Sequence, residues 1–339
     1  MHILKSILTA GLVAASLPGI AAAAPAYSVS GSIAIPDGGW DYASFDLASR
    51  QVFIARSTSI TVVNVATGAA ARNFGTIARG HAALPLPGGR LAVTSGSDNT
   101  LRLFDEQKGT QLASVAVGAD PDAAIFDPHT DDVLVMDAHE GSVAVVDPAS
   151  AKLVRKIALK PGLEFAAIDR RGTLFVNNED LSRIDVANPA TGSVAAPIAL
   201  TGCEGPSGLA YDEKTDRLIA ACANGKAAVV DAHAKRLVGL LDIGKGPDAV
   251  LIDTRRRVAF VPCGRDGTLV QIDLDGAQGP HVAATIKTEI GARTGAIDPS
   301  DGAIYLPAAR FSPPPTAGER PAIIPGSVHL VVVKPSAGG

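Results

Sequence analysis

The sequence lacks the features that usually mark nucleic-acid, carbohydrate and haem proteins. Its formal net charge is -4 and its longest basic run, at 255–257, is short, so no nucleic-acid partner is expected. Aromatic residues make up 4% of the chain, with a single tryptophan, which argues against a sugar platform of stacked rings. No Gly-x-Ser-x-Gly, His-Glu-x-x-His, P-loop or Cys-x-x-Cys-His motif occurs. No familiar nucleophile, zinc-protease, nucleotide or haem site is therefore indicated.

Long apolar runs are also absent, except at the N-terminus. Residues 1–26 contain Lys5, the apolar stretch ILTAGLVAASL at 7–17 and the small-residue stretch AAAAPA at 21–26. This order predicts a signal peptide over residues 1–26, which is removed on export. We therefore expect the mature chain to be periplasmic or secreted and to have no membrane span. A monomer is the expected state.

Glycine and proline, by contrast, are abundant, with 35 and 23 copies. Between them, Val, Ile and Leu alternate with small polar residues, which is typical of many short strands joined by turns. Similar segments recur about every 42 residues. DPDAAIFD at 120–127 and GPDAVLID at 246–253 begin 126 residues apart, which is three such periods. Equivalent short strands, the first of each repeat, end at Asp46, Leu86, Asp127, Asp169, Asp212, Asp253 and Asp298.

Each repeat has room for four strands separated by turns, which is the pattern of a β-propeller blade. We predict an all-β, seven-bladed β-propeller with four-stranded blades over residues 27–339. The last repeat has only three strands, whereas an additional strand, VSGSIAIPDGG at 29–39, precedes the first repeat. This N-terminal strand is expected to join the last blade and close the ring, which hides two sheet edges. A proline-rich insertion over 310–327 lengthens one loop of the last blade.

Six of the seven first strands have a charged or ionisable residue five positions before their last residue. Because the inner strands of a propeller converge at its axis, these side chains should ring one mouth of the central channel. The seven ring residues are Asp41, His81, Asp122, Glu164, Ser207, Asp248 and Arg293, and a loop of the same face adds Arg56. Turn capping is the competing explanation for Asp122 and Asp248, since an Asp after Pro commonly bonds nearby N–H groups.

Carboxylates that face one narrow channel repel each other, so they must take up protons, pair with Arg293 or bind a cation. The candidate metal ligands are Asp41, Asp122, Glu164 and Asp248. Oxygen donors suit Ca²⁺ or Mg²⁺, and the addition of His81 would permit Zn²⁺ or Mn²⁺. A divalent cation is the one cofactor that the sequence suggests.

The repeats resemble those of a known propeller family. Residues 143–169 and 227–253 follow the form xxVxVVDxxTGKxVxxIxVGxxPxxxxxD, and WDY at 40–42, CEGPSGL at 203–209 and GART at 291–294 add to the likeness. On these segments, nearly the whole mature chain resembles the YVTN-repeat, YncE-like seven-bladed propellers of bacterial periplasms. The resemblance implies an exported propeller but no single activity, because propellers serve as lactonases, lyases, dehydrogenase subunits and plain binding platforms.

Three cysteines leave two pairings open in an oxidising compartment. A Cys203–Cys222 bond would tie the loop before one inner strand to its own blade, and a Cys222–Cys263 bond would join adjacent blades. The resembling subgroup pairs the cysteine of a CE-x-P-x-GL stretch with a later Cys-x-Asn, which implies here a Cys203–Cys222 bond and a free Cys263. A catalytic thiolate is a third interpretation, and it lacks a nearby base.

Two functions of different classes fit these observations. The first is a binding or interaction platform, whose acidic channel mouth holds a small polar molecule, a metal ion or a protein partner. The alternative is a metal-dependent, lactonase-like hydrolase or lyase. In it the ion polarises a carbonyl or activates water, a spare carboxylate or His81 moves a proton, and Arg293 holds an oxyanion. The family resemblance and the lack of a nucleophile motif favour the first; a redox accessory subunit is a third hypothesis.

Overall fold

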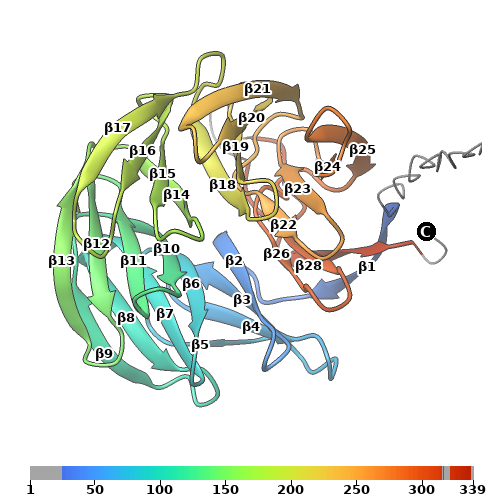
Figure 1. The fold of residues 1–339 in the computed structure, drawn as a ribbon. Helices are drawn as coiled ribbons and strands as arrows, with labels where there is room; N and C mark the ends of the chain where they lie inside the picture. The colour runs from blue at the N-terminus through green and yellow to red at the C-terminus, as the bar shows by residue number, and fades with distance from the viewer. Residues whose placement is uncertain (1–24, 315, 317–320, 337–339) are drawn as a thin grey trace, which may run out of the picture.

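The computed structural model describes residues 25–314, 316 and 321–336, and it shows the predicted seven-bladed β-propeller (Figure 1). Seven four-stranded antiparallel sheets follow one another around a ring. The helical content of these residues is one 3-10 turn, Gly96–Asp98. Nothing helical in the described part of the chain has the length and apolarity that a membrane crossing needs. All but two residues of the predicted signal peptide lie outside the described residues.

Each of the first six blades pairs its strands in sequence order, beginning at the axis. The first blade contains β2 (Trp40–Asp46), β3 (Gln51–Arg56), β4 (Ile60–Asn64) and β5 (Arg72–Phe74). The second contains β6 (Gly80–Leu86), β7 (Arg90–Ser95), β8 (Thr100–Asp105) and β9 (Gln111–Ala116). The third contains β10 (Pro121–Asp127), β11 (Asp132–Asp137), β12 (Ser142–Asp147) and β13 (Lys152–Ala158).

The next three blades repeat this arrangement. The fourth contains β14 (Leu163–Ile168), β15 (Leu174–Asn178), β16 (Arg183–Ala187) and β17 (Val194–Ala199). The fifth contains β18 (Pro206–Asp212), β19 (Arg217–Cys222), β20 (Lys226–Asp231) and β21 (Arg236–Asp242). The sixth contains β22 (Leu251–Asp253), β23 (Val258–Cys263), β24 (Thr268–Asp273) and β25 (His281–Lys287).

The seventh blade is built from both ends of the described chain. It contains β26 (Ala296–Ile297), β27 (Ile304–Ala308) and β28 (His329–Pro335), and its outer strand is β1 (Tyr27–Ala34). β1 runs antiparallel to β28, with Tyr27 opposite Pro335 and Ala34 opposite His329. The prediction that the N-terminal strand closes the ring is therefore confirmed, and the closure covers two sheet edges.

The core lies between the faces of neighbouring blades. Phe53 of the first blade packs in one cluster with Val93 and Phe104 of the second. Tyr27 of the seventh blade meets Phe260 of the sixth edge to face, with ring centroids 4.6 Å apart. Because a neighbouring blade covers each face, middle strands such as β11 are buried along most of their length, whereas the outer strand β13 is largely exposed. This explains why the middle strands read as nearly continuous apolar runs.

The aspartates at the ends of the innermost strands cap the turns that follow them. Asp127 accepts hydrogen bonds from the backbone N–H of His129, at 2.8 Å, and from the hydroxyl of Thr130, at 3.0 Å. The amide two residues further along makes the same contact in three other blades. We call this buried set the turn aspartates: Asp127, Asp169, Asp212, Asp253 and Asp298. Their recurrence in the sequence serves the shape of the turns.

The cysteines and the proline-rich insertion shape the fifth and seventh blades. The structure joins Cys203 to Cys222, whose Cα atoms lie 5.4 Å apart, and leaves Cys263 free and buried. This bond ties the loop before β18 to the end of β19. The insertion runs between β27 and β28, and within its described residues Phe311 and Ile323 form an isolated β-bridge. That part of the insertion therefore folds back on itself.

Candidate functional site

A shared irregularity in the inner strands directs the ring residues. Between β2 and β3, the pairing passes from Trp40–Arg56 to Ala43–Ile54, so two residues on the inner strand oppose one on its partner. The same bulge occurs in β6, β10, β14 and β18. In each of the five strands the first bulged residue is the ring residue. A bulge bends a strand and redirects its side chains. Here it allows a polar side chain at the beginning of the strand to point toward the axis.

Six of the seven ring residues line one pocket of about 310 Å³. They are Asp41, His81, Asp122, Glu164, Asp248 and Arg293. The other lining residues are Tyr42, Arg79, Asp120, Ala138 and Glu179. We call this cavity the mouth pocket. Its lining holds six carboxyl groups but only two arginines and one histidine, so positive charge is in short supply.

Ser207 and Arg56 do not line the mouth pocket. The Ser207 hydroxyl donates to the carbonyl of Pro247 at 3.2 Å. The Arg56 guanidinium is buried and donates to the carbonyls of Pro36, at 2.7 Å, and Gly38, at 2.9 Å. A buried guanidinium needs acceptors, and the segment that follows the closing strand supplies two. The structure therefore uses these two residues to fasten loops and does not bring them to the predicted site.

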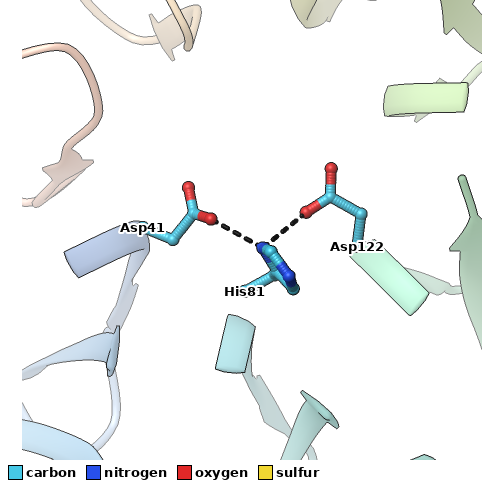
Figure 2. A group of neighbouring side chains, drawn as sticks. All are labelled: Asp41, His81 and Asp122. Atoms are coloured by element: carbon cyan, nitrogen blue, oxygen red, sulfur yellow. Dashed lines mark hydrogen bonds and ion pairs between the residues drawn. The ribbon is translucent and has the colours of Figure 1, made fainter. Parts of the chain in front are cut away.

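His81 lies between two aspartates from the neighbouring blades (Figure 2). Its Nδ1 is 2.7 Å from Oδ2 of Asp41 and 3.1 Å from Oδ1 of Asp122. Its Nε2 is buried, has no hydrogen-bond partner within the described residues, and lies 3.8 Å from Oδ1 of Asp120. Both neighbours of Nδ1 are acceptors, so this nitrogen carries a proton when no ion is bound. Three inner strands, β2, β6 and β10, thus converge on one imidazole nitrogen.

The four-carboxylate ligand set that the sequence suggested is not gathered in one place. Glu164 accepts a hydrogen bond from the Tyr42 hydroxyl at 3.1 Å, and Asp248 accepts one from Nε of Arg293 at 2.7 Å. Among the described residues, one group of three offers metal-ligating atoms that all lie within 4.8 Å of one another: Asp41, His81 and Asp122. The predicted ligands Asp41 and Asp122 are therefore brought together with His81, and Glu164 and Asp248 stand apart.

The turn-capping explanation for Asp122 and Asp248 is wrong. Within the described residues, the Asp122 carboxylate pairs with His81 and the Asp248 carboxylate with Arg293. Neither accepts a hydrogen bond from a backbone N–H there, in contrast to Asp127. Because they do not cap a turn, these two side chains can face the channel.

The shortage of positive charge shows in the pKa values of the mouth pocket. Burial raises the pKa of Asp122 to about 7, although the charge of His81 opposes the shift. Burial and the charges of Asp122 and Glu179 raise the pKa of Glu164 to about 10. Burial also raises the pKa of Asp248, against the opposing charge of Arg293. The mouth pocket therefore keeps protons on groups that are normally ionised at neutral pH.

His81 and Arg293 are the basic side chains that contact the carboxylates of the ring residues. Burial lowers the pKa of His81, but the hydrogen bond to Asp41 and the charge of Asp122 outweigh burial, and the net pKa is raised. Arg293 approaches Oδ1 of Asp41 with Nη2, at 3.6 Å, besides its bond to Asp248. Asp41 thus presents one oxygen to His81 and the other to Arg293.

Sequence reasoning missed Tyr42, Arg79 and Asp120. Arg79 and Asp120 pair at 3.0 Å on the rim of the pocket, and each stands two positions before a ring residue. At that position four blades have a glycine with positive φ: Gly162, Gly205, Gly246 and Gly291. Arg79 and Asp120 hold the same left-handed backbone, with φ of 61° and 58°, which disfavours any residue with a Cβ. The replacement of glycine at a repeated position was the signal that could have revealed them.

Comparison with known proteins supports the fold and goes no further. No family model matches this chain, and no match to a curated protein was found. Hydrazine synthase of Kuenenia stuttgartiensis contains a chain that is 15% identical, with a TM-score of 0.67, covering 82% of this chain and 95% of that one. A chain in a crystal structure of a mitotic checkpoint complex is 11% identical, with a TM-score of 0.75, covering 97% of this chain and 98% of that one. At these identities the likeness shows a β-propeller, and the YVTN-repeat resemblance stays a prediction.

Proposed function

We propose that this protein is an exported binding propeller, which holds a divalent metal ion at the mouth of its central channel. The observation that carries the proposal is the placement of Nδ1 of His81 between carboxylate oxygens of Asp41 and Asp122, at 2.7 and 3.1 Å. Ligands about 2.1 Å from a metal in tetrahedral or octahedral geometry lie about 3.0–3.4 Å from one another. Small side-chain adjustments would therefore suffice to admit an ion.

The donor set limits which metal fits. One imidazole and two carboxylates suit Zn²⁺ or Mn²⁺ better than Ca²⁺, which takes six to eight oxygen ligands. Three protein ligands leave further positions for water or a bound molecule, as in sites that act on a ligand. Arg293 contacts the second oxygen of Asp41, and such outer contacts hold a ligating carboxylate in place.

Proton exchange connects the metal to the raised pKa values. An ion at this position would replace the proton on Nδ1 of His81 and would favour the ionised form of Asp122, whose pKa is raised mainly by burial, so binding should release protons. Because the pKa of Asp122 is raised to about 7, the affinity for metal should increase as the pH rises through neutrality. Cation binding at this site should therefore be coupled to proton release.

Metal titration of the mature protein, after removal of bound metal with a chelator, tests the proposal. We expect about one equivalent of Zn²⁺ or Mn²⁺ by isothermal titration calorimetry, and at least about a 100-fold loss of affinity in His81→Ala and Asp122→Asn. His139→Ala is the matched control, because His139 is an exposed histidine of a neighbouring loop. Equal affinity in His81→Ala and the wild type would contradict the proposal.

A second function, metal-dependent hydrolysis of an ester or lactone, is favoured by one observation. The carboxyl of Glu164 faces the same pocket, and its pKa of about 10 keeps it protonated at neutral pH. A metal-bound carbonyl would then have a proton donor for its leaving group nearby. Hydrolysis of a lactone and ester panel by zinc-loaded protein, lost in Glu164→Gln without loss of zinc, would establish this function. If the zinc-loaded wild type hydrolyses none of these compounds, binding is the only function that remains proposed.

A further inference from the structure

A second cavity adjoins the mouth pocket. It is a groove of about 450 Å³, and Asp248 and Arg293 line both cavities. The remaining lining includes Ile290, Phe311 and Ala223. We call this cavity the side groove. A volume of this size, mostly apolar and with a few charged groups at one end, is typical of small-molecule sites.

Glycines keep the floor of the side groove open. A Cβ added at Gly264 would lie 2.7 Å from Cβ of Arg293, and one added at Gly291 would lie 2.8 Å from the ring of Phe311. Neither position accepts a side chain without displacing a wall. Ile290 stands at the edge with 65% of its surface exposed, a large apolar side chain that a ligand could cover.

The charges of the side groove differ from those of the mouth pocket. Two arginines, Arg265 and Arg293, line it beside one carboxylate, Asp248. Arg293 is paired with Asp248 and also approaches Asp41, whereas Arg265 forms no ion pair within the described residues. The groove therefore carries positive charge next to apolar walls, which suits an organic anion better than a cation.

We propose that the side groove binds a small organic carboxylate with an aromatic or branched apolar body. The body lies against Ile290 and Phe311, and the carboxylate points to Arg293 at the junction of the two cavities. An ion held by Asp41, His81 and Asp122 tightens this binding, because it offers the carboxylate an open position and screens the acidic lining. The tighter binding in the presence of an ion rests on the proposed function. Binding of the carboxylate in the side groove does not.

The single tryptophan offers a direct probe of occupancy. A Cβ added at Gly291 would lie 3.9 Å from Cζ2 of Trp40, so the indole is beside the floor of the side groove. Trp40 is buried, and it immediately precedes Asp41 in β2. A ligand in the groove should therefore change the tryptophan fluorescence of the intact protein.

The test is a fluorescence titration of the mature protein with 3-phenylpropionate, with and without Zn²⁺. The neutral 3-phenylpropanamide and the cationic 3-phenylpropylamine are the matched probes. We expect 3-phenylpropionate to bind best, and about 10-fold more tightly with Zn²⁺ than without it. Ala223→Phe, at an exposed wall, and Ile290→Asn should each weaken its binding about 10-fold. Leu181→Asn, at an exposed leucine of another blade, should leave it unchanged.

The outcomes separate the inference from the proposed function. Tighter binding of the amine than of the carboxylate, or equal binding by Ala223→Phe and the wild type, overturns the inference even if Zn²⁺ binds. A protein that fails to bind Zn²⁺ overturns the proposed function and the tightening by the ion. If that protein still binds 3-phenylpropionate in a way that depends on Ile290, the side groove is supported as an anion site; if not, the whole inference falls.

Discussion

Aspartates occur at both ends of the innermost segment in three blades, with Asp122 and Asp127 as one such pair, and across the propeller the aspartates of the two ends differ in what surrounds them. Among the turn aspartates, Asp212 accepts hydrogen bonds from the Thr215 hydroxyl and, at 2.7 Å, from the Arg257 guanidinium. At the mouth, Asp122 pairs within the described residues with His81 and otherwise faces carboxylates. Burial raises the pKa at both places, but Arg257 and Thr215 lower the pKa of Asp212 overall, whereas that of Asp122 rises to about 7.

The comparison shows that the repeat alone does not tell which aspartate is structural. A buried carboxylate with enough donors is part of the architecture. A carboxylate that is shielded from water and has too few hydrogen-bond donors is unfavourable in its ionised form, and a bound cation can stabilise that form. The mouth pocket has more carboxyl groups than cations, and for this reason we place function there and not at the turns.

The largest expected effect is the loss of a turn aspartate. Asp212→Ala removes one of the two carboxylates that pair with the Arg257 guanidinium, and also the acceptor of the Thr215 hydroxyl, so the free energy of unfolding should fall by about 2–3 kcal/mol. Asp122→Ala in metal-free protein should change it by less than about 1 kcal/mol, because it removes repulsion. Urea denaturation of both variants makes the comparison. Similar losses would mean that the two sets of aspartates do the same structural work.

Metal binding should make the mouth pocket stabilise the folded protein instead of destabilising it. At about 100 times its dissociation constant, Zn²⁺ should raise the free energy of unfolding by about 2.7 kcal/mol. The melting temperature, followed by circular dichroism, should rise with Zn²⁺ and fall back on chelation. Asp122→Asn should abolish the rise, and His139→Ala should keep it. A rise that persists in Asp122→Asn would place the ion elsewhere.

The pH dependence of stability should have opposite signs for the two sets. Because the pKa of folded Asp122 is raised to about 7, the folded protein holds a proton that the unfolded chain has released, and metal-free protein should lose about 3 kcal/mol of stability as the pH rises from about 4 to about 7. The lowered pKa of Asp212 contributes stability above about pH 4 that is lost as the pH falls. Urea denaturation across this range should show a decline that Asp122→Asn flattens. An unchanged decline in that variant would assign the protons to other groups.

The smallest effect concerns Arg79. Arg79→Gly relieves the left-handed backbone of this residue and removes an exposed ion pair with Asp120. The free energy of unfolding should rise by about 0.5 kcal/mol. Thermal denaturation can resolve this change, and Arg79→Lys, which keeps the Cβ, is its control. A clear loss of stability in Arg79→Gly would show that the ion pair outweighs the backbone strain.

The fold could be predicted because its signals are local and repeated. An aspartate such as Asp127 ends the first strand of six of the seven repeats, and similar strand and turn segments recur about every 42 residues. The additional strand predicted at 29–39 could complete only the three-stranded last repeat, and it pairs with β28 there. Each of these features depends on short-range geometry, which the sequence displays directly.

The site could be predicted only in part. The equal spacing of the ring residues followed from the blade repeat, and so the sequence could place Asp41, His81 and Asp122 near one another. Spacing could not show that the Ser207 hydroxyl would turn to Pro247, because local hydrogen bonding decides that. The protonation of Glu164 was also hidden, since its pKa depends on burial and on carboxylates from other blades.

The most direct test of the account is the number of protons released when the mouth binds a cation. Titration calorimetry of Zn²⁺ into metal-free protein at about pH 7, in two buffers of different ionisation enthalpy, measures this number. The account predicts the release of about one to two protons per ion in the wild type, and no tight binding in Asp122→Asn. Binding without proton release, or no binding at all, would contradict the claim that the mouth pocket exchanges stored protons for a metal ion.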